Sequence, residues 1–301
     1  MHRRATILCA LALAPILQGC IAAIAAIPLM AMGTMATKGR EEIREERERR
    51  FATRLNADAA SVARDDSSAV TSSRSAIGAP STSPGLSAIA AMAGPSSYAP
   101  MTSFALSQLE RRAAGQALTS AVLAGSADIR NPRFTPCGNL PPAVLIDLDD
   151  KTLGPNPALA DPGALVPLTA EPGLAGELAR LRAAGVAVLW MSDHPFDVDQ
   201  AIYARLQAAG LDPAGRDPVY ARMVQADRKH DRRQEVASRY CVLAVVGDTR
   251  TDAEESYDYL LRPELAAPLE PMWGAGWFIL PLPLHAAGTE DPLHGGTAPT
   301  P

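Results

Sequence analysis

Four short polar segments of this 301-residue chain carry residue types that could do chemistry. They are Asp147-Leu148-Asp149-Asp150, Ser192-Asp193, Lys229, and the run from Gly247 to Asp252. Several carboxylates that converge on one point repel one another unless a cation neutralises them. Hard oxygen ligands with waters left over suit Mg²⁺. Carboxylates, a hydroxyl, a lysine and Mg²⁺ around one point can hold a phosphoryl group and stabilise its developing charge.

The segments that must position these residues alternate between strand and helix patterns. Strands are predicted over residues 143–148, 186–191, 218–224, 242–246 and 277–280, and helices over residues 173–184, 198–209, 229–239 and 251–261. This alternation predicts an α/β fold with a doubly wound, mostly parallel sheet and helices on both faces. Because ligands of such sheets bind beyond the carboxyl ends of the strands, we expect the four polar segments to meet at that edge.

Two further segments flank the first predicted strand. Residues 103–124 have a helical pattern, with Leu106 and Leu109 on one face, and predict a helix that docks on the domain. Residues 154–172 are rich in proline and too short for a folded cap domain above the sheet. We therefore expect a small or absent cap and an open site.

The four polar segments, taken in order, resemble the four motifs of the haloacid dehalogenase (HAD) phosphatases. These motifs are a hydrophobic strand followed by DxD (144–149), a strand ending in serine (188–192), a lysine with a basic run (229–236) and GDxxxD (247–252). Residues 277–283 are also similar to the last strand of the exported class B and class C acid phosphatases, the latter including lipoproteins. The resemblance covers about residues 104–285 and implies the HAD-like version of the predicted fold.

The resemblance implies a role for each catalytic candidate. Asp147 would attack phosphorus and form an aspartyl-phosphate. Asp149 would protonate the leaving oxygen and then activate water. Ser192 and Lys229 would hold phosphoryl oxygens, with Lys229 as a compact positive charge. The expected substrate is a small-molecule phosphomonoester or an exposed phosphate on a larger molecule.

The resemblance also implies a Mg²⁺ site at the same edge of the sheet. Asp147, Asp248 and the backbone carbonyl of Asp149 would bind the metal. Asp252 would orient Lys229 or metal-bound water. The expected metal site therefore comprises Asp147, Asp149, Asp248 and Asp252.

The chain departs from the family pattern at two places. The family has threonine or valine two positions after Asp149, whereas here Lys151 stands at that position and Thr152 follows it. Asp193-His194 follows the second motif at the place where the acid phosphatases often have Asn-Arg. The altered first motif favours an alternative function, in which a catalytically degenerate HAD fold serves as a binding or scaffold module of the cell envelope.

Cys137 and Cys241 precede two strands that are neighbours in the HAD sheet. The resemblance therefore places both cysteines at the end of the sheet opposite the active site, about 5 Å of strand spacing apart and within disulfide reach. The alternative is that Cys241 is a small buried hydrophobic residue and Cys137 a free loop thiol. The prolines and the glycine of residues 136–142 slightly favour this alternative, because they could carry Cys137 away from the sheet.

The first residues have the pattern of an export signal. Basic residues precede an apolar run over residues 5–17, and Leu17-Gln18-Gly19-Cys20 resembles the bacterial lipobox, in which the cysteine is lipidated after cleavage. Apolar character resumes over residues 21–37, so an uncleaved transmembrane anchor is the alternative. Both alternatives imply membrane attachment. The expected location is the cell envelope outside the cytoplasm, either in the periplasm or as an outer-membrane lipoprotein.

Composition divides the chain into five parts. Residues 1–37 form the signal or anchor, 38–56 a charged helix, 57–102 a linker rich in serine, alanine and proline, 103–285 the HAD-like domain and 286–301 a flexible tail. The formal net charge is −5, which argues against nucleic acid as a partner.

The lipobox yields a direct prediction. If Cys20 is lipidated, Cys20→Ser should leave an unprocessed precursor and block labelling with a fatty-acid analogue. Cys9→Ser, in the same apolar segment, is the control and should label like the parent chain. Labelling that survives Cys20→Ser would rule the lipobox out and favour the transmembrane anchor.

Overall fold

The structure is a computed structural model that describes residues 42, 45–47, 49, 95–127, 129–150, 155, 159 and 167–286. The chain divides into two compact units, Met1–Ser73 and Arg74–Pro301. The predicted export signal, the lipobox, most of the linker and the tail lie outside the described residues. Among the residues described, no helix combines the length and the apolar character needed to cross a bilayer.

In the first unit, the described residues belong to the charged segment. Residues 42, 45–47 and 49 are helical. Arg49 forms an ion pair with Glu46, with 3.1 Å between Nη2 and Oε2. Pairs at this i,i+3 spacing are expected of a charged helix that contacts solvent.

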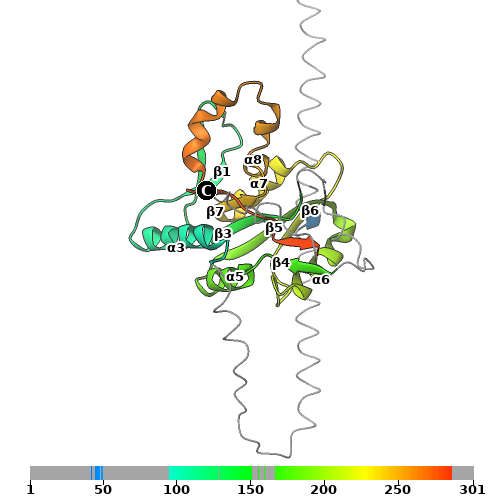
Figure 1. Cartoon of the computed structure of the whole chain (residues 1–301). Coiled ribbons are helices and arrows are strands. Elements are labelled where there is room, and N and C mark those ends of the chain that lie inside the picture. Colours follow the sequence, from blue (N-terminus) through cyan, green and yellow to red (C-terminus); the bar gives the residue numbers. More distant parts are fainter. Residues whose placement is uncertain are drawn as a thin grey trace, which may run out of the picture. The chain divides into compact units, whose positions relative to one another are not determined.

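A five-stranded sheet forms the centre of the second unit (Figure 1). Its strands follow the order β6 (Val219–Arg222), β5 (Ala187–Pro195), β3 (Pro142–Asp147), β7 (Cys241–Gly247) and β8 (Trp277–Ile279). All neighbouring pairs are parallel. The predicted parallel α/β sheet is therefore confirmed, and β3 lies at its middle.

The strands of this sheet are buried on both faces. Along β3, Val144 and Ile146 pack into one hydrophobic cluster, and Ala143 and Leu145 pack into a second. This division follows from the strand itself, because successive side chains point to opposite faces. The near-continuous apolar runs of the sequence are the pattern of such doubly covered strands.

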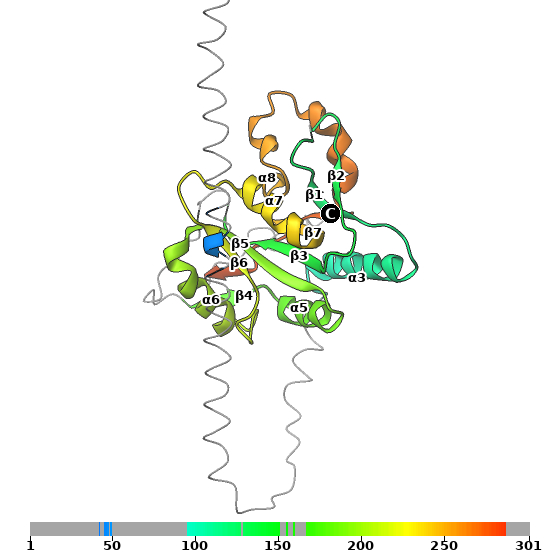
Figure 2. The same cartoon turned by 180° about the vertical axis from the view of Figure 1, so that it is seen from behind.

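Helices cover both faces, as Figure 2 shows. The first cluster includes residues of α3 (Ala99–Ala113), α5 (Leu174–Ala183) and α6 (Asp199–Ala208). The second includes residues of α7 (Lys229–Arg239) and of the short strand β1 (Thr119–Leu123). The sheet with its two covering layers is the doubly wound arrangement that the sequence predicts.

Several short elements of the described chain were not predicted from the sequence. β1 pairs antiparallel with β2 (Phe134–Pro136), and β4 (Leu168–Ala170) pairs antiparallel with β9 (Leu284–Ala286). The 3₁₀ helices are η1 (Phe196–Val198), η2 (Glu255–Tyr259) and η3 (Pro263–Met272). The pairing of β4 with β9 joins segments that are distant in the sequence, and η2 begins at a local side-chain cap.

The predicted helix over residues 103–124 is wrong at both ends, because α3 begins at Ala99, within the segment predicted as linker, and does not extend beyond Ala113. The face of Leu106 and Leu109 does belong to a helix, α3, and packs against the first cluster. However, α3 ends at Ala113, and Gly115 adopts a φ of 78°, which glycine reaches without steric strain. The segment that follows is β1, which is buried in the second cluster.

The predicted helix over residues 251–261 is also wrong in its extent. The α-helix α8 covers only Arg250–Ala253. Glu254 then adopts an extended backbone, with φ −152° and ψ 114°, and its side chain accepts a hydrogen bond from the Ser256 amide at 3.1 Å. This bond caps η2, so the chain continues as a separate 3₁₀ helix.

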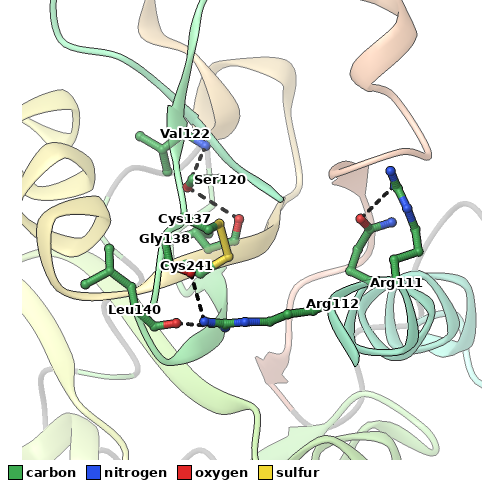
Figure 3. Close-up of a disulfide and its surroundings, with 10 residues drawn as sticks. Arg111, Arg112, Ser120, Val122, Cys137, Gly138, Leu140 and Cys241 are labelled. Atoms are coloured by element: carbon green, nitrogen blue, oxygen red, sulfur yellow. Dashed lines mark hydrogen bonds between the residues drawn. A yellow bond between two sulfur atoms is a disulfide. The ribbon is translucent and has the colours of Figure 1, made fainter. Parts of the chain in front are cut away.

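Cys137 and Cys241 form a disulfide, so the slightly favoured alternative of unpaired cysteines is wrong (Figure 3). Their Cα atoms are 4.8 Å apart, and both residues are buried. The proline-rich segment does not carry Cys137 away because Arg112 of α3 holds it. The Arg112 guanidinium donates to the carbonyls of Leu140 at 2.8 Å and Gly138 at 3.0 Å.

The disulfide closes a loop with a sequence separation of 104 residues, so its removal should cost stability. Replacing both Cys137 and Cys241 by serine should lower the free energy of unfolding by about 2–5 kcal/mol, because the unfolded chain regains loop entropy. Urea denaturation would measure the loss. Dithiothreitol should destabilise the parent chain by a similar amount and leave the double variant unchanged. A parent chain insensitive to reductant would contradict the bond.

Candidate active site

The four polar segments meet at the carboxyl edge of the sheet. Asp147 is the last residue of β3, and Ser192 lies near the end of the adjacent strand β5. Lys229 is the first residue of α7. Asp248 directly follows β7, and Asp252 lies in α8. All the predicted site residues therefore come from strand ends or from the helices next to them.

Lys229 is the positive centre of this cluster. Its Nζ donates a hydrogen bond to Asp147 and lies 3.4 Å from Asp252 Oδ1, 3.6 Å from Asp149 Oδ2 and 3.7 Å from Asp193 Oδ2. Burial acts to lower the pKa of Lys229, but the four carboxylates together raise that pKa above its ordinary value. Lys229 therefore remains a fixed positive charge at neutral pH.

In contrast to Lys229, Asp147 lies in surroundings that disfavour its charged form. Burial raises the pKa of its carboxyl well above the ordinary range, and the nearby Asp252 and Asp149 add to this effect. The charge of Lys229 acts in the other direction. A carboxylate in this environment is one whose charged form a second cation would stabilise further.

Asp149 is tied to the end of β5. Its carboxylate accepts a hydrogen bond from Ser192 Oγ at 2.9 Å and another from the backbone amide of Asp193. Its own amide donates to Asp147 Oδ1 at 3.3 Å. Ser192 Oγ in turn accepts a bond from the amide of His194 at 3.1 Å. The polar segments that follow β3 and end β5 are therefore joined directly by hydrogen bonds.

Asp252 is fixed by the turn that follows β7. Its Oδ2 accepts bonds from the amide and the hydroxyl of Thr249, both at 3.0 Å, within a capping box at the start of α8. Burial acts to raise the pKa of Asp252, but the hydrogen bond with Asp147 and the charge of Lys229 lower it overall. Asp252 therefore stays ionised beside Lys229.

Oxygen ligands for a cation are present at this edge. Asp252 interacts at hydrogen-bond range with both Asp147 and Asp248, and such close carboxylates need a shared proton or a cation. Within the described part of the chain, no three acidic, histidine or cysteine residues are grouped so that together they could hold a metal ion. Mg²⁺ does not require such a group, since it is usually held by one or two carboxylates and keeps several waters. The donor set therefore fits Mg²⁺.

A cavity of about 410 Å³ opens beside the cluster. Its lining includes Asp149, Lys229 and Asp252 of the predicted site. Arg228, which directly precedes α7, and Tyr259 of η2 also line it. These three predicted site residues thus border a space that a small molecule can enter, whereas Asp147 and Ser192 are buried and do not line it. The segment expected to replace a cap lies mostly outside the described residues, so the absence of a cap stays a prediction.

Two buried arginines of α7 were not among the predicted site residues. Arg232 donates a hydrogen bond to Asp193, and Arg233 donates to the backbone carbonyl of Asp252 at 3.0 Å. They follow Lys229 by three and four residues, a spacing that places side chains on the same face of a helix. This spacing was the feature of the sequence that could have revealed them.

No family model matches the chain, and no curated protein matches it. Solved structures do match it at low similarity. A class C acid phosphatase from Bacillus anthracis is 20% identical over 48% of this chain and 68% of its own, with a TM-score of 0.38. The same enzyme with tungstate bound is 15% identical over 67% and 80%, with a TM-score of 0.43. The Pnkp1/Rnl/Hen1 RNA repair complex is 19% identical over 54% and 46%, with a TM-score of 0.32.

Gly247 offers a test of the site geometry, because a Cβ at this position would lie 2.3 Å from both Cβ and Oδ2 of Asp252. Gly247→Ala should displace Asp252 and lower the free energy of unfolding by about 1–3 kcal/mol. Urea denaturation would measure the change.

Gly176 of α5 provides the matched control, since nothing lies within 4 Å of a Cβ placed there. Gly176→Ala should stabilise the chain by roughly 0.5–1 kcal/mol, because alanine favours a helix over glycine. A Gly247→Ala variant as stable as the parent would contradict the close approach of Asp252 to β7.

Proposed function

We propose that this chain hydrolyses phosphomonoesters, with Asp147 as the nucleophile and Mg²⁺ as the cofactor. The observation that carries the proposal is the contact between Lys229 and Asp147 at the carboxyl end of the middle strand. Asp149 and Asp252 lie within 3.6 Å of the same lysine Nζ. A phosphoryl group beside Asp147 would meet a nucleophile, a fixed positive charge and a proton donor together.

The reaction would proceed in two steps. Asp147 attacks phosphorus, the bond from phosphorus to the leaving oxygen breaks, and Asp149 gives that oxygen a proton. Asp149 then takes a proton from a water molecule, which attacks phosphorus, releases inorganic phosphate and restores Asp147. Lys229 and Ser192 hold the phosphoryl oxygens during both steps.

Mg²⁺ would supply a Lewis acid that neutralises charge on the phosphoryl oxygens. The residues that would hold it are Asp147, Asp149 and Asp248, of which Asp149 contributes its backbone carbonyl. Asp252 would orient Lys229 or metal-bound water. The close approach of the acidic side chains supports this assignment, because a divalent cation would relieve their repulsion.

We further propose that the chain is attached to a membrane in the cell envelope, outside the cytoplasm, through a lipid on Cys20 or a transmembrane anchor. The N-terminal sequence pattern supports this location. The disulfide between Cys137 and Cys241 supports it independently, because such bonds persist in oxidising compartments and are rare in the cytosol. The substrate would be a small phosphomonoester or an exposed phosphate on a larger molecule.

One observation favours the alternative of a catalytically degenerate binding or scaffold module. The Asp149 carboxylate already accepts hydrogen bonds from Ser192 and from the Asp193 amide, so the proposed proton donor is engaged within the protein. The unusual Lys151 of the first motif points the same way but lies outside the described residues. Phosphatase assays of the purified chain decide between the two functions.

The proposal predicts that Asp147→Asn abolishes Mg²⁺-dependent hydrolysis of p-nitrophenyl phosphate. Because the nucleophile is lost, turnover by the full-length chain should fall by at least about a thousandfold, while circular dichroism stays unchanged. Asp149→Asn should lower turnover by roughly a hundredfold or more, because it removes the proton donor. Assays with Mg²⁺ and with excess chelator would test the metal requirement.

Asp197→Asn is a matched control for these two variants. Asp197 is an exposed carboxylate of η1 that is not part of the cavity lining, so its loss should leave turnover unchanged. Equal turnover in Asp147→Asn and the parent would refute the nucleophile. Inactivity of the parent chain with every phosphomonoester tested would favour the degenerate module.

A further inference from the structure

Asp193 lies between two cations at the candidate active site. Its Oδ2 is 3.7 Å from Lys229 Nζ, and its Oδ1 accepts a hydrogen bond from Arg232 Nη2. The Asp193 side chain is 37% exposed and lines the cavity, whereas the Arg232 side chain is 0% exposed. Asp193 therefore lies between the buried Arg232 guanidinium and the cavity.

The Arg232 guanidinium has more hydrogen-bonding capacity than its partners use. Its Nη1 donates to the backbone carbonyl of Asp227 at 3.1 Å and lies 3.6 Å from the Asp227 carboxylate. Its Nε is buried and has no hydrogen-bond partner. Burying such a donor without a partner is unfavourable. Because arginine stays charged and its planar donors match phosphate oxygens, this side chain is suited to bind an anion.

We propose that Arg232 is a second phosphate-binding cation and that Asp193 occupies its place until phosphate displaces it. This inference rests on the proposed function, because it takes the phosphoryl group to lie beside Lys229. The Asp193 carboxylate presents one oxygen to each cation, as two oxygens of a phosphoryl group would. An arriving phosphate repels this carboxylate, and the exposed Asp193 side chain turns toward solvent. A phosphoryl oxygen then takes its position on Arg232.

In this proposal, the Asp193 carboxylate occupies the phosphate-binding position between Lys229 and Arg232 while no phosphate is bound. Phosphate binding includes the free-energy cost of separating Asp193 from Arg232. Removal of Asp193 should therefore strengthen phosphate binding, whereas a residue that merely shapes the site would weaken binding when removed. Arg232 remains in place without Asp193, since it keeps both of its contacts with Asp227.

The test is isothermal titration of the full-length chain with inorganic phosphate in the presence of Mg²⁺. Asp193→Ala should lower the dissociation constant for phosphate on the order of tenfold, because a negative charge next to the anion is removed. Asp193→Asn should give a smaller gain, because its amide oxygen can still accept the bond from Arg232. Asp258→Asn, which removes the same charge from the cavity lining at η2, controls for net charge and should change affinity far less.

A double variant separates phosphate binding by Arg232 from a purely structural role. In the Asp193→Ala background, Arg232→Gln should raise the dissociation constant back to the parent value or above it. If Arg232 served only to orient Asp193, the same substitution would have no effect in this background. Thermal unfolding confirms that the variants fold. If the variant that carries Arg232→Gln does not fold, Asp193→Ala alone, which keeps Arg232, still tests the proposal.

The outcomes distinguish this inference from the proposed function. Equal or weaker phosphate binding by Asp193→Ala overturns the inference and leaves the role of Asp147 untouched. An equal gain from Asp258→Asn also overturns it, because the effect would then be one of overall charge. If neither the parent nor any variant binds phosphate, the inference and the proposed function fall together.

Discussion

The charge of Lys229 balances the carboxylates that the fold concentrates at one edge of the sheet. Parallel strands end on the same side, so the acidic residues that follow β3 and β7 meet whatever their distance in sequence. Without a cation among them, their repulsion would drive protonation or open the edge. Lys229 meets this requirement from the start of α7, which packs on the sheet through Val236 and Ala237. The site and the packing of α7 therefore depend on each other.

The position of Asp147 is fixed by β3, the middle strand of the sheet. Two hydrophobic clusters enclose this strand, and neighbouring strands hold both of its sides. Asp147 lies at the end of this strand, so the same contacts hold its backbone in place. The other side chains reach it from the end of β5, the start of α7 and the turn before α8. If Asp147 is the nucleophile, as proposed, it is carried by a strand that both clusters enclose.

The features that were predicted correctly from the sequence are those that burial and periodicity determine. The central strands were recognised because near-continuous apolar runs are required of strands covered on both faces, and the bounds of α7 agree with the prediction. β1 was taken for helix because its pairing with β2 cannot be deduced from local pattern. The bond between Cys137 and Cys241 was underestimated because the hold of Arg112 on the proline-rich segment is a tertiary contact. Arg232 was missed because charged runs usually face solvent, and its partner Asp193 is 39 residues away.

The disulfide at the opposite end of the sheet has a topological consequence. The covalent ring between Cys137 and Cys241 contains Asp147, Ser192 and Lys229, while Asp248 and Asp252 lie just beyond it. A protease that cuts once inside this ring cannot separate the pieces, which remain one molecule until a reductant opens the bond. During synthesis, the ring cannot close until residue 241 has been made. Ring closure therefore cannot precede the synthesis of three of the four polar segments.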